Sequence, residues 1–135
     1  MYQQMIFVNL PVADLDASKK FFTGLGYSID PRFSDENTAS VVISDTIIAM
    51  LLTRQKYAEF TKKEIVDATR SSQVLLALSA ESREKVDELV EKALAAGGST
   101  AGGTQDLGFM YGRSFDDLDG HTWEVAWMDP AALEG

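Results

Sequence analysis

The chain has 135 residues, of which 45% are hydrophobic and 10% aromatic, values typical of one globular domain with a substantial core. Its 12 basic and 21 acidic residues give a net charge of −9, which repels phosphate backbones and argues against nucleic acid as a partner. The absence of Cys excludes disulfides, a thiol nucleophile and Cys-based metal sites. No apolar run reaches membrane-spanning length, and no secretory signal opens the chain, so we expect a cytoplasmic protein without membrane contact.

The first half of the sequence predicts the element order β-α-β-β-β. A strand is expected over residues 5–12, with Pro11 at the end of the strand or at a sheet edge. Asp14 is expected to cap a helix over residues 15–25, and Gly26 to end it. Turn signals then separate three predicted strands, over residues 27–33, 39–44 and 46–53.

A polar connector over residues 54–73, expected to contain one or two short helices, leads into a second copy of this pattern. A strand is predicted over residues 74–80, and Ser82 is expected to cap the helix that follows, because apolar side chains recur there at helical spacing. A short strand around residues 99–101 precedes a hairpin. Its strands are expected over residues 109–115 and 121–128, joined by a turn at residues 116–120 that contains Asp-Gly.

Side chains alternate between the two faces of a strand, and this decides what the last hairpin can present. Trp123 and Val125 share one face of the final strand, and Glu124 lies on the other. On the partner strand Tyr111 and Arg113 share a face, but alternation does not tell which face of this strand looks into a cavity. The repeated pattern predicts a single α+β domain over residues 1–135, with modules at residues 5–53 and 74–128.

Two segments carry a family resemblance: VNLPVADLDASKKFFTGLGY at residues 8–27 and DLDGHTWE at residues 117–124. With the double module they resemble the vicinal-oxygen-chelate superfamily, which holds glyoxalase I, extradiol dioxygenases, fosfomycin-resistance enzymes and bleomycin-resistance proteins. Residues 106–124 look like those of small bacterial predicted lactoylglutathione lyases. The resemblance implies two βαβββ modules that form an incompletely closed, cupped mixed β-barrel with helices outside. It also implies a homodimer.

The same resemblance implies a divalent metal held by one side chain on the first and last strand of each module. Glu124 matches the last of these positions, but Phe7 and Leu75 stand where the family usually has His or Gln. The fourth position falls within residues 46–53, which contain no carboxylate, imidazole or amide. Three of the four ligands are therefore absent, and one carboxylate does not make a metal site. We predict no cofactor, and Zn, Ni or Mn only if unidentified donors complete a site.

Glu124 is the candidate catalytic residue, either as a general base in a dry cavity or as a metal ligand. Alternatively it is a relic carboxylate that is paired with Arg113 or hydrogen-bonded within the barrel. The candidate ligand-binding residues are Phe7, Asn9, Leu75, Tyr111 and Arg113. Arg113 would either clamp an anionic group or lie among surface acids. We interpret His121 as structural, because it points away from the face of Glu124. The Asp-rich turn lacks the ligand pattern of a calcium loop.

These residues support three functional hypotheses, and the sequence leaves open whether the protein is an enzyme. The preferred one is a metal-free protein that binds a small organic ligand, as bleomycin-resistance proteins do. The alternative is a lactoylglutathione-lyase-like lyase or isomerase that uses Glu124. The third is a dimerising interaction module whose cavity is filled by its own side chains.

Overall fold

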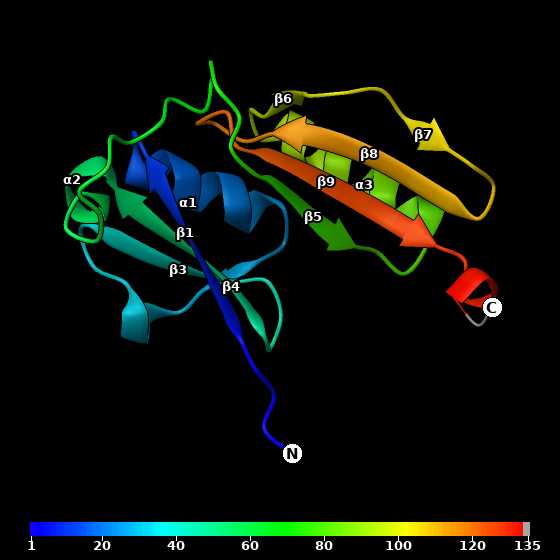
Figure 1. The fold of residues 1–135 in the computed structure, drawn as a ribbon, viewed down its shortest axis with the longest axis horizontal. Helices are drawn as coiled ribbons and strands as arrows, with labels where there is room; N and C mark the ends of the chain where they lie inside the picture. The colour runs from blue at the N-terminus through cyan, green and yellow to red at the C-terminus, as the bar shows by residue number, and fades with distance from the viewer. Residues whose placement is uncertain (134–135) are drawn as a thin grey trace. The chain divides into compact units, whose positions relative to one another are not determined.

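The computed structural model describes residues 1–133 and divides the chain into two compact units, Met1–Val66 (unit 1) and Asp67–Gly135 (unit 2) (Figure 1). Each unit contains a mixed β-sheet and a helix that packs on one face of that sheet. The chain is therefore α+β, as predicted. Within residues 1–133 no helix is both long enough and apolar enough to cross a membrane.

Unit 1 has the predicted element order β-α-β-β-β. Its elements are β1 (Ile6–Val12), α1 (Leu15–Gly24), β2 (Ser28–Ile29), the 3-10 helix η1 (Pro31–Phe33), β3 (Thr38–Val42), β4 (Ile47–Thr53) and α2 (Arg54–Tyr57). The sheet order is β1-β4-β3-β2, with β1 parallel to β4 and the other pairs antiparallel. Pro11 lies in the edge strand β1, where a missing N–H costs least.

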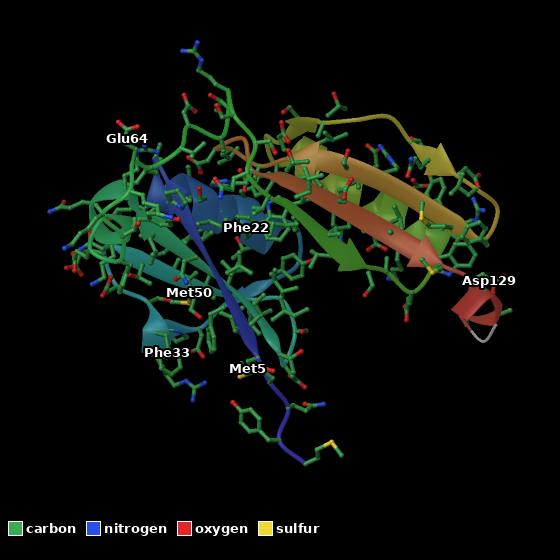
Figure 2. All side chains as sticks on the ribbon, in the orientation of Figure 1. Met5, Phe22, Phe33, Met50, Glu64 and Asp129 are labelled. Carbon is green, nitrogen blue, oxygen red and sulfur yellow. The ribbon has the colours of Figure 1, made fainter. Side chains whose placement is uncertain are left out.

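The core of unit 1 lies between α1 and its sheet. Asp14 caps α1 as expected, accepting a hydrogen bond from the Ala17 N–H at 3.1 Å. The helix buries Phe21 and Phe22, whose rings meet edge to face at 5.1 Å. Figure 2 labels Phe22 among the side chains of unit 1. On the sheet side Leu10, Val12 and Leu51 are buried as well. Burying one such side chain stabilises the fold by roughly 1.5–3 kcal/mol.

Unit 2 repeats the plan with one strand more. Its elements are β5 (Leu75–Ser79), α3 (Arg83–Ala95), β6 (Ser99–Thr100), β7 (Gln105–Asp106), β8 (Met110–Asp116), β9 (Thr122–Met128) and the 3-10 helix η2 (Pro130–Leu133). The sheet order is β5-β9-β8-β6, with β7 also paired to β8, and β5 runs parallel to β9. Ser82 caps α3 as predicted, and Val86 and Val90 of α3 are buried in the core of the unit.

The elements differ from the predicted ones in two places. The expected strand over residues 27–33 is only the two-residue β2, because Pro31 begins the 3-10 helix η1 and the Asp30 side chain caps it. The strand β7 was not predicted; polar residues at an exposed sheet edge give no hydrophobic alternation to detect. The connector contains one short helix, α2, within the predicted range of one or two.

Candidate functional site

The sheet of unit 2 has one face covered by α3 and one face without a helix. Trp123 and Val125 of β9 point to the covered face and are 2% and 0% exposed. Glu124, between them, points to the opposite face and is exposed. In the register it lies beside Ala77 of β5 and Ser114 of β8. We name this face, which carries Leu75, Ala77, Ser114 and Glu124, the open face of unit 2.

The Glu124 carboxylate has no hydrogen bond and no ion pair within residues 1–133. Its register neighbours are a methyl group and a hydroxyl group, from Ala77 and Ser114. Leu75 lies on the same face of β5, with 58% of its surface exposed. The open face thus brings together two of the predicted site residues, Glu124 and Leu75.

Phe7 and Asn9 share a face of β1 in unit 1, as their spacing predicts. Phe7 is 55% exposed, and the Asn9 side-chain amide donates to the Phe7 carbonyl at 3.4 Å. Their register partners on β4 are Ile48 and Met50, which offer no carboxylate, imidazole or amide. This face can therefore contact a ligand through an aromatic ring, an amide and apolar side chains.

Tyr111 and Arg113 lie on the α3-covered face, opposite to Glu124. The Tyr111 hydroxyl donates to Asp87 Oδ1 at 2.6 Å, and Arg113 donates to Asp87 Oδ1 and Glu91 Oε1, both at 3.0 Å. The hydrogen bond from Tyr111, followed by that from Arg113, lowers the pKa of Asp87. The bond to Asp87 in turn raises the pKa of Tyr111. The structure does not bring these two residues together with Glu124.

This arrangement answers one question that the sequence left open. Because Arg113 and Glu124 lie on opposite faces, an ion pair between them is wrong as an account of Glu124. Arg113 instead joins β8 to α3, since its two partners are one helical turn apart on the helix. A local pattern could not reveal this, because Tyr111 and Arg113 are as polar as the residues of an exposed face.

The unit 2 residues beside Glu124 in the sheet do not by themselves form a set of donors for a divalent metal. Ala77, Ser114 and Leu75 supply no anionic or imidazole donor, and a first-row metal needs several such donors held in place. Asn9, the one amide among the predicted site residues, belongs to unit 1. The family's metal chemistry therefore has no donor set in the open face.

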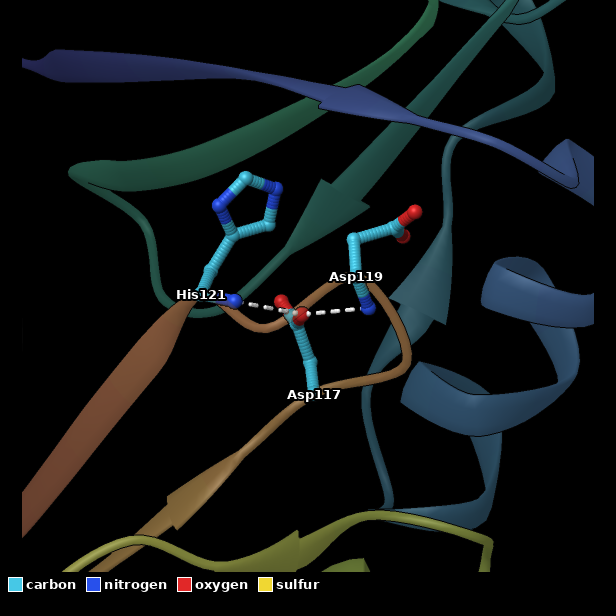
Figure 3. A group of neighbouring side chains, drawn as sticks. All are labelled: Asp117, Asp119 and His121. Carbon is cyan, nitrogen blue, oxygen red and sulfur yellow. Dashed lines mark hydrogen bonds between the residues drawn. The ribbon is translucent and has the colours of Figure 1, made fainter. Parts of the chain in front are cut away.

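Three potential metal donors do converge elsewhere in the described residues, in the turn between β8 and β9. Ligand atoms of Asp117, Asp119 and His121 all lie within 4.8 Å of one another (Figure 3). Asp117 is 6% exposed, and both oxygens of its carboxylate already accept hydrogen bonds. Its Oδ1 accepts the N–H groups of Asp119 and His121, and its Oδ2 accepts the Trp123 indole N–H, each at 3.0 Å.

This cluster therefore holds the turn together. Burial raises the pKa of Asp117, an effect that the nearby His121 and the hydrogen bonds from Trp123 and the turn N–H groups oppose. The Asp-rich segment forms the predicted turn, but its local pattern does not indicate that Asp117 is buried. The Asp-x-Asp-x-His spacing was the available signal.

Sequence and structure comparisons show which known proteins this chain resembles. A family model described as bleomycin resistance protein-like N-terminal matches residues 4–44. A hypothetical protein from S. aureus, SA1046, shares 28% identity with a TM-score of 0.77, over 94% of each chain. The chain has the vicinal-oxygen-chelate fold. This confirms the superfamily resemblance in fold over the chain and in sequence over its first third.

Two further solved structures extend the likeness. A glyoxalase-related enzyme from Fulvimarina pelagi is 24% identical with a TM-score of 0.77, over 93% of this chain and 88% of that one. The fosfomycin resistance protein FosX from Mesorhizobium loti is 13% identical with a TM-score of 0.71, over 100% of both chains. A comparison with curated proteins gave no match. The vicinal-oxygen-chelate fold hosts several chemistries, so the reaction must be argued from the residues.

Proposed function

We propose that this protein binds a small organic molecule without a metal ion, in the manner implied by its likeness to bleomycin-resistance proteins. One observation carries the proposal. The vicinal-oxygen-chelate position on β9 retains its carboxylate, Glu124, while its neighbours on the open face are apolar or small. Such a surface suits an organic ligand, with apolar contacts to Leu75 and one polar anchor. For unit 1 by itself, Phe7 and Asn9, both exposed on one face of β1, are the proposed ligand contacts.

Metal content and ligand binding test this proposal together. The protein is expressed with zinc, nickel and manganese supplied, purified without chelators, and measured by plasma mass spectrometry. We expect far less than one equivalent of metal per chain. Bleomycin and fosfomycin, named for relatives of this fold, are then screened by thermal shift with a panel of small aromatic compounds. At least one compound should raise the melting temperature of the metal-free protein. Failure of every compound to bind would overturn the proposal.

A second candidate function is a lactoylglutathione-lyase-like isomerase. The observation in its favour is that Glu124 has no partner in residues 1–133, so its carboxylate is available to take a proton. This function predicts about one bound metal per chain and turnover of the glutathione–methylglyoxal adduct. Turnover would be lost on chelation and in Glu124→Gln, and intact in Glu84→Gln, which removes an exposed acid from α3. Those results would replace the binding proposal.

We propose a homodimer as well, on the strength of the family resemblance. Light scattering after size-exclusion chromatography measures the mass directly. A mass near 14.8 kDa would be that of a monomer and would contradict this part of the proposal.

A further inference from the structure

The strands of both units contain few charged residues, and those of unit 2 are not balanced between the two faces of its sheet. The four strands of unit 1 contain no ionisable residue. The strands of unit 2 contain one basic residue, Arg113, and three acidic ones, Asp106, Asp116 and Glu124. Which of these charges a ligand meets depends on the face to which each points.

The basic residue points away from the open face. Arg113 lies on the α3-covered face, where Asp87 and Glu91 both bind its guanidinium group at 3.0 Å. Its charge is thus paired locally, and little of it remains to attract an anion across the sheet. Asp106 also points to the covered face, because it pairs with Tyr111 in the register, and Arg83 neutralises it.

Two acidic residues remain on the open face. Glu124 lies in the middle of β9 without a partner in residues 1–133. Asp116 of β8 is the register partner of Thr122, two residues before Glu124, and its Oδ1 accepts the Thr122 hydroxyl at 2.6 Å. No Lys, Arg or His of the described strands shares this face with them. The whole protein, with a net charge of −9, adds a field of the same sign.

From this charge pattern we infer that the ligand of the open face is an organic cation, such as an amine, an amidine or a guanidinium. The inference rests on the proposed function and specifies its ligand class. An ammonium group would donate a charge-assisted hydrogen bond to the Glu124 carboxylate, while the apolar part of the ligand would contact Leu75. A phosphonate or carboxylate would meet two like charges there, and no cation from the described strands of unit 2. The open face therefore selects by the sign of the ligand's charge.

Three probes that share a naphthylmethyl group and differ in charge test the inference: 1-naphthylmethylamine, 1-naphthylmethanol and 1-naphthylacetic acid. Binding is measured by calorimetry, and amide chemical shifts of β5, β8 and β9 localise it. The amine should bind at least about tenfold more tightly than the acid, because a hydrogen bond to a charged group changes the affinity by about tenfold. Added salt should narrow the difference, since screening weakens exposed charges.

The matched variants are Glu124→Gln and Glu84→Gln, which remove one negative charge each, from the open face and from the outer surface of α3. Glu124→Gln should lower the affinity for the amine about tenfold and leave the affinity for the neutral alcohol unchanged. Glu84→Gln should change both less than twofold. Unchanged melting temperatures would show that both variants fold.

The outcomes separate this inference from the proposed function. Binding of the acid as tightly as the amine, or an equal loss in both variants, overturns the choice of a cation and leaves ligand binding standing. Shifts absent from β5, β8 and β9 with all three probes overturn both the inference and the open face as the binding surface.

Discussion

Replacing Asp117 tests whether the turn between β8 and β9 depends on one buried carboxylate. Asp117→Ala removes three hydrogen bonds, from the N–H groups of Asp119 and His121 and from the indole N–H of Trp123. Bonds to a charged acceptor are worth roughly 1.5–3 kcal/mol each, and relief from burying the carboxylate offsets part of the loss. We expect the free energy of unfolding to fall by about 4 kcal/mol.

Guanidinium denaturation followed by tryptophan fluorescence measures this loss of stability in unit 2. The chain has two Trp residues, Trp123 and Trp127, and both belong to unit 2. Glu84→Gln removes an exposed carboxylate of the same unit, in the first turn of α3, and should change stability by less than about 1 kcal/mol.

A double-mutant cycle isolates the indole bond from the rest of the cluster. Trp123→Phe should cost less in the Asp117→Ala background than in the natural protein, because its partner is already gone. If Asp117→Ala costs less than about 1 kcal/mol, or if the two changes are additive, the carboxylate does not hold the turn and the reasoning fails.

Three further perturbations follow from the structure of unit 2. Gly120→Ala should lower the free energy of unfolding by about 3 kcal/mol in urea denaturation, because Gly120 has φ of 87° and a Cβ there would lie 2.7 Å from a backbone nitrogen. Gly103→Ala, with open space around it, should cost less than about 1 kcal/mol. Equal costs for the two variants would contradict this reasoning. The hydrogen bonds from Arg83, followed by that from the Gly108 N–H, lower the pKa of Asp106 to about 2. Carbon NMR should find this pKa in the natural protein and a higher one in Arg83→Gln, where only the bond from Gly108 remains. Because the pKa of Asp106 is lower in the folded protein, its pairing with Arg83 stabilises the fold above pH 3.8, and this stabilisation is lost as the pH falls toward 2. An unchanged pKa in the variant would refute the pairing. Val90→Ala, at a helix position 1% exposed, should cost about 2 kcal/mol in the same denaturation assay, and a loss below about 1 kcal/mol would mean that α3 packs less tightly than described.

Much of the fold was predictable because local rules act on adjacent residues. Asp14 and Ser82 cap their helices as expected, since a side-chain oxygen next to a helical run has free N–H groups within reach. The alternation along β9 placed Trp123 and Glu124 on opposite faces, because that geometry is fixed by the pleat. That Phe7 and Leu75 stand where the resemblance implies metal ligands stays a prediction from the sequence.

What the sequence determined by itself was therefore the set of elements, the sidedness of each strand and the residue types at the family positions. The tertiary structure decided which side of β8 meets α3, because that depends on Asp87 and Glu91 reaching Tyr111 and Arg113 across more than twenty residues of chain. It also decided that Asp117 is buried, since the Trp123 indole and the turn N–H groups converge on it only after the hairpin closes. Alternation is a property of one strand, whereas burial and charge pairing require a second element whose position no local pattern contains.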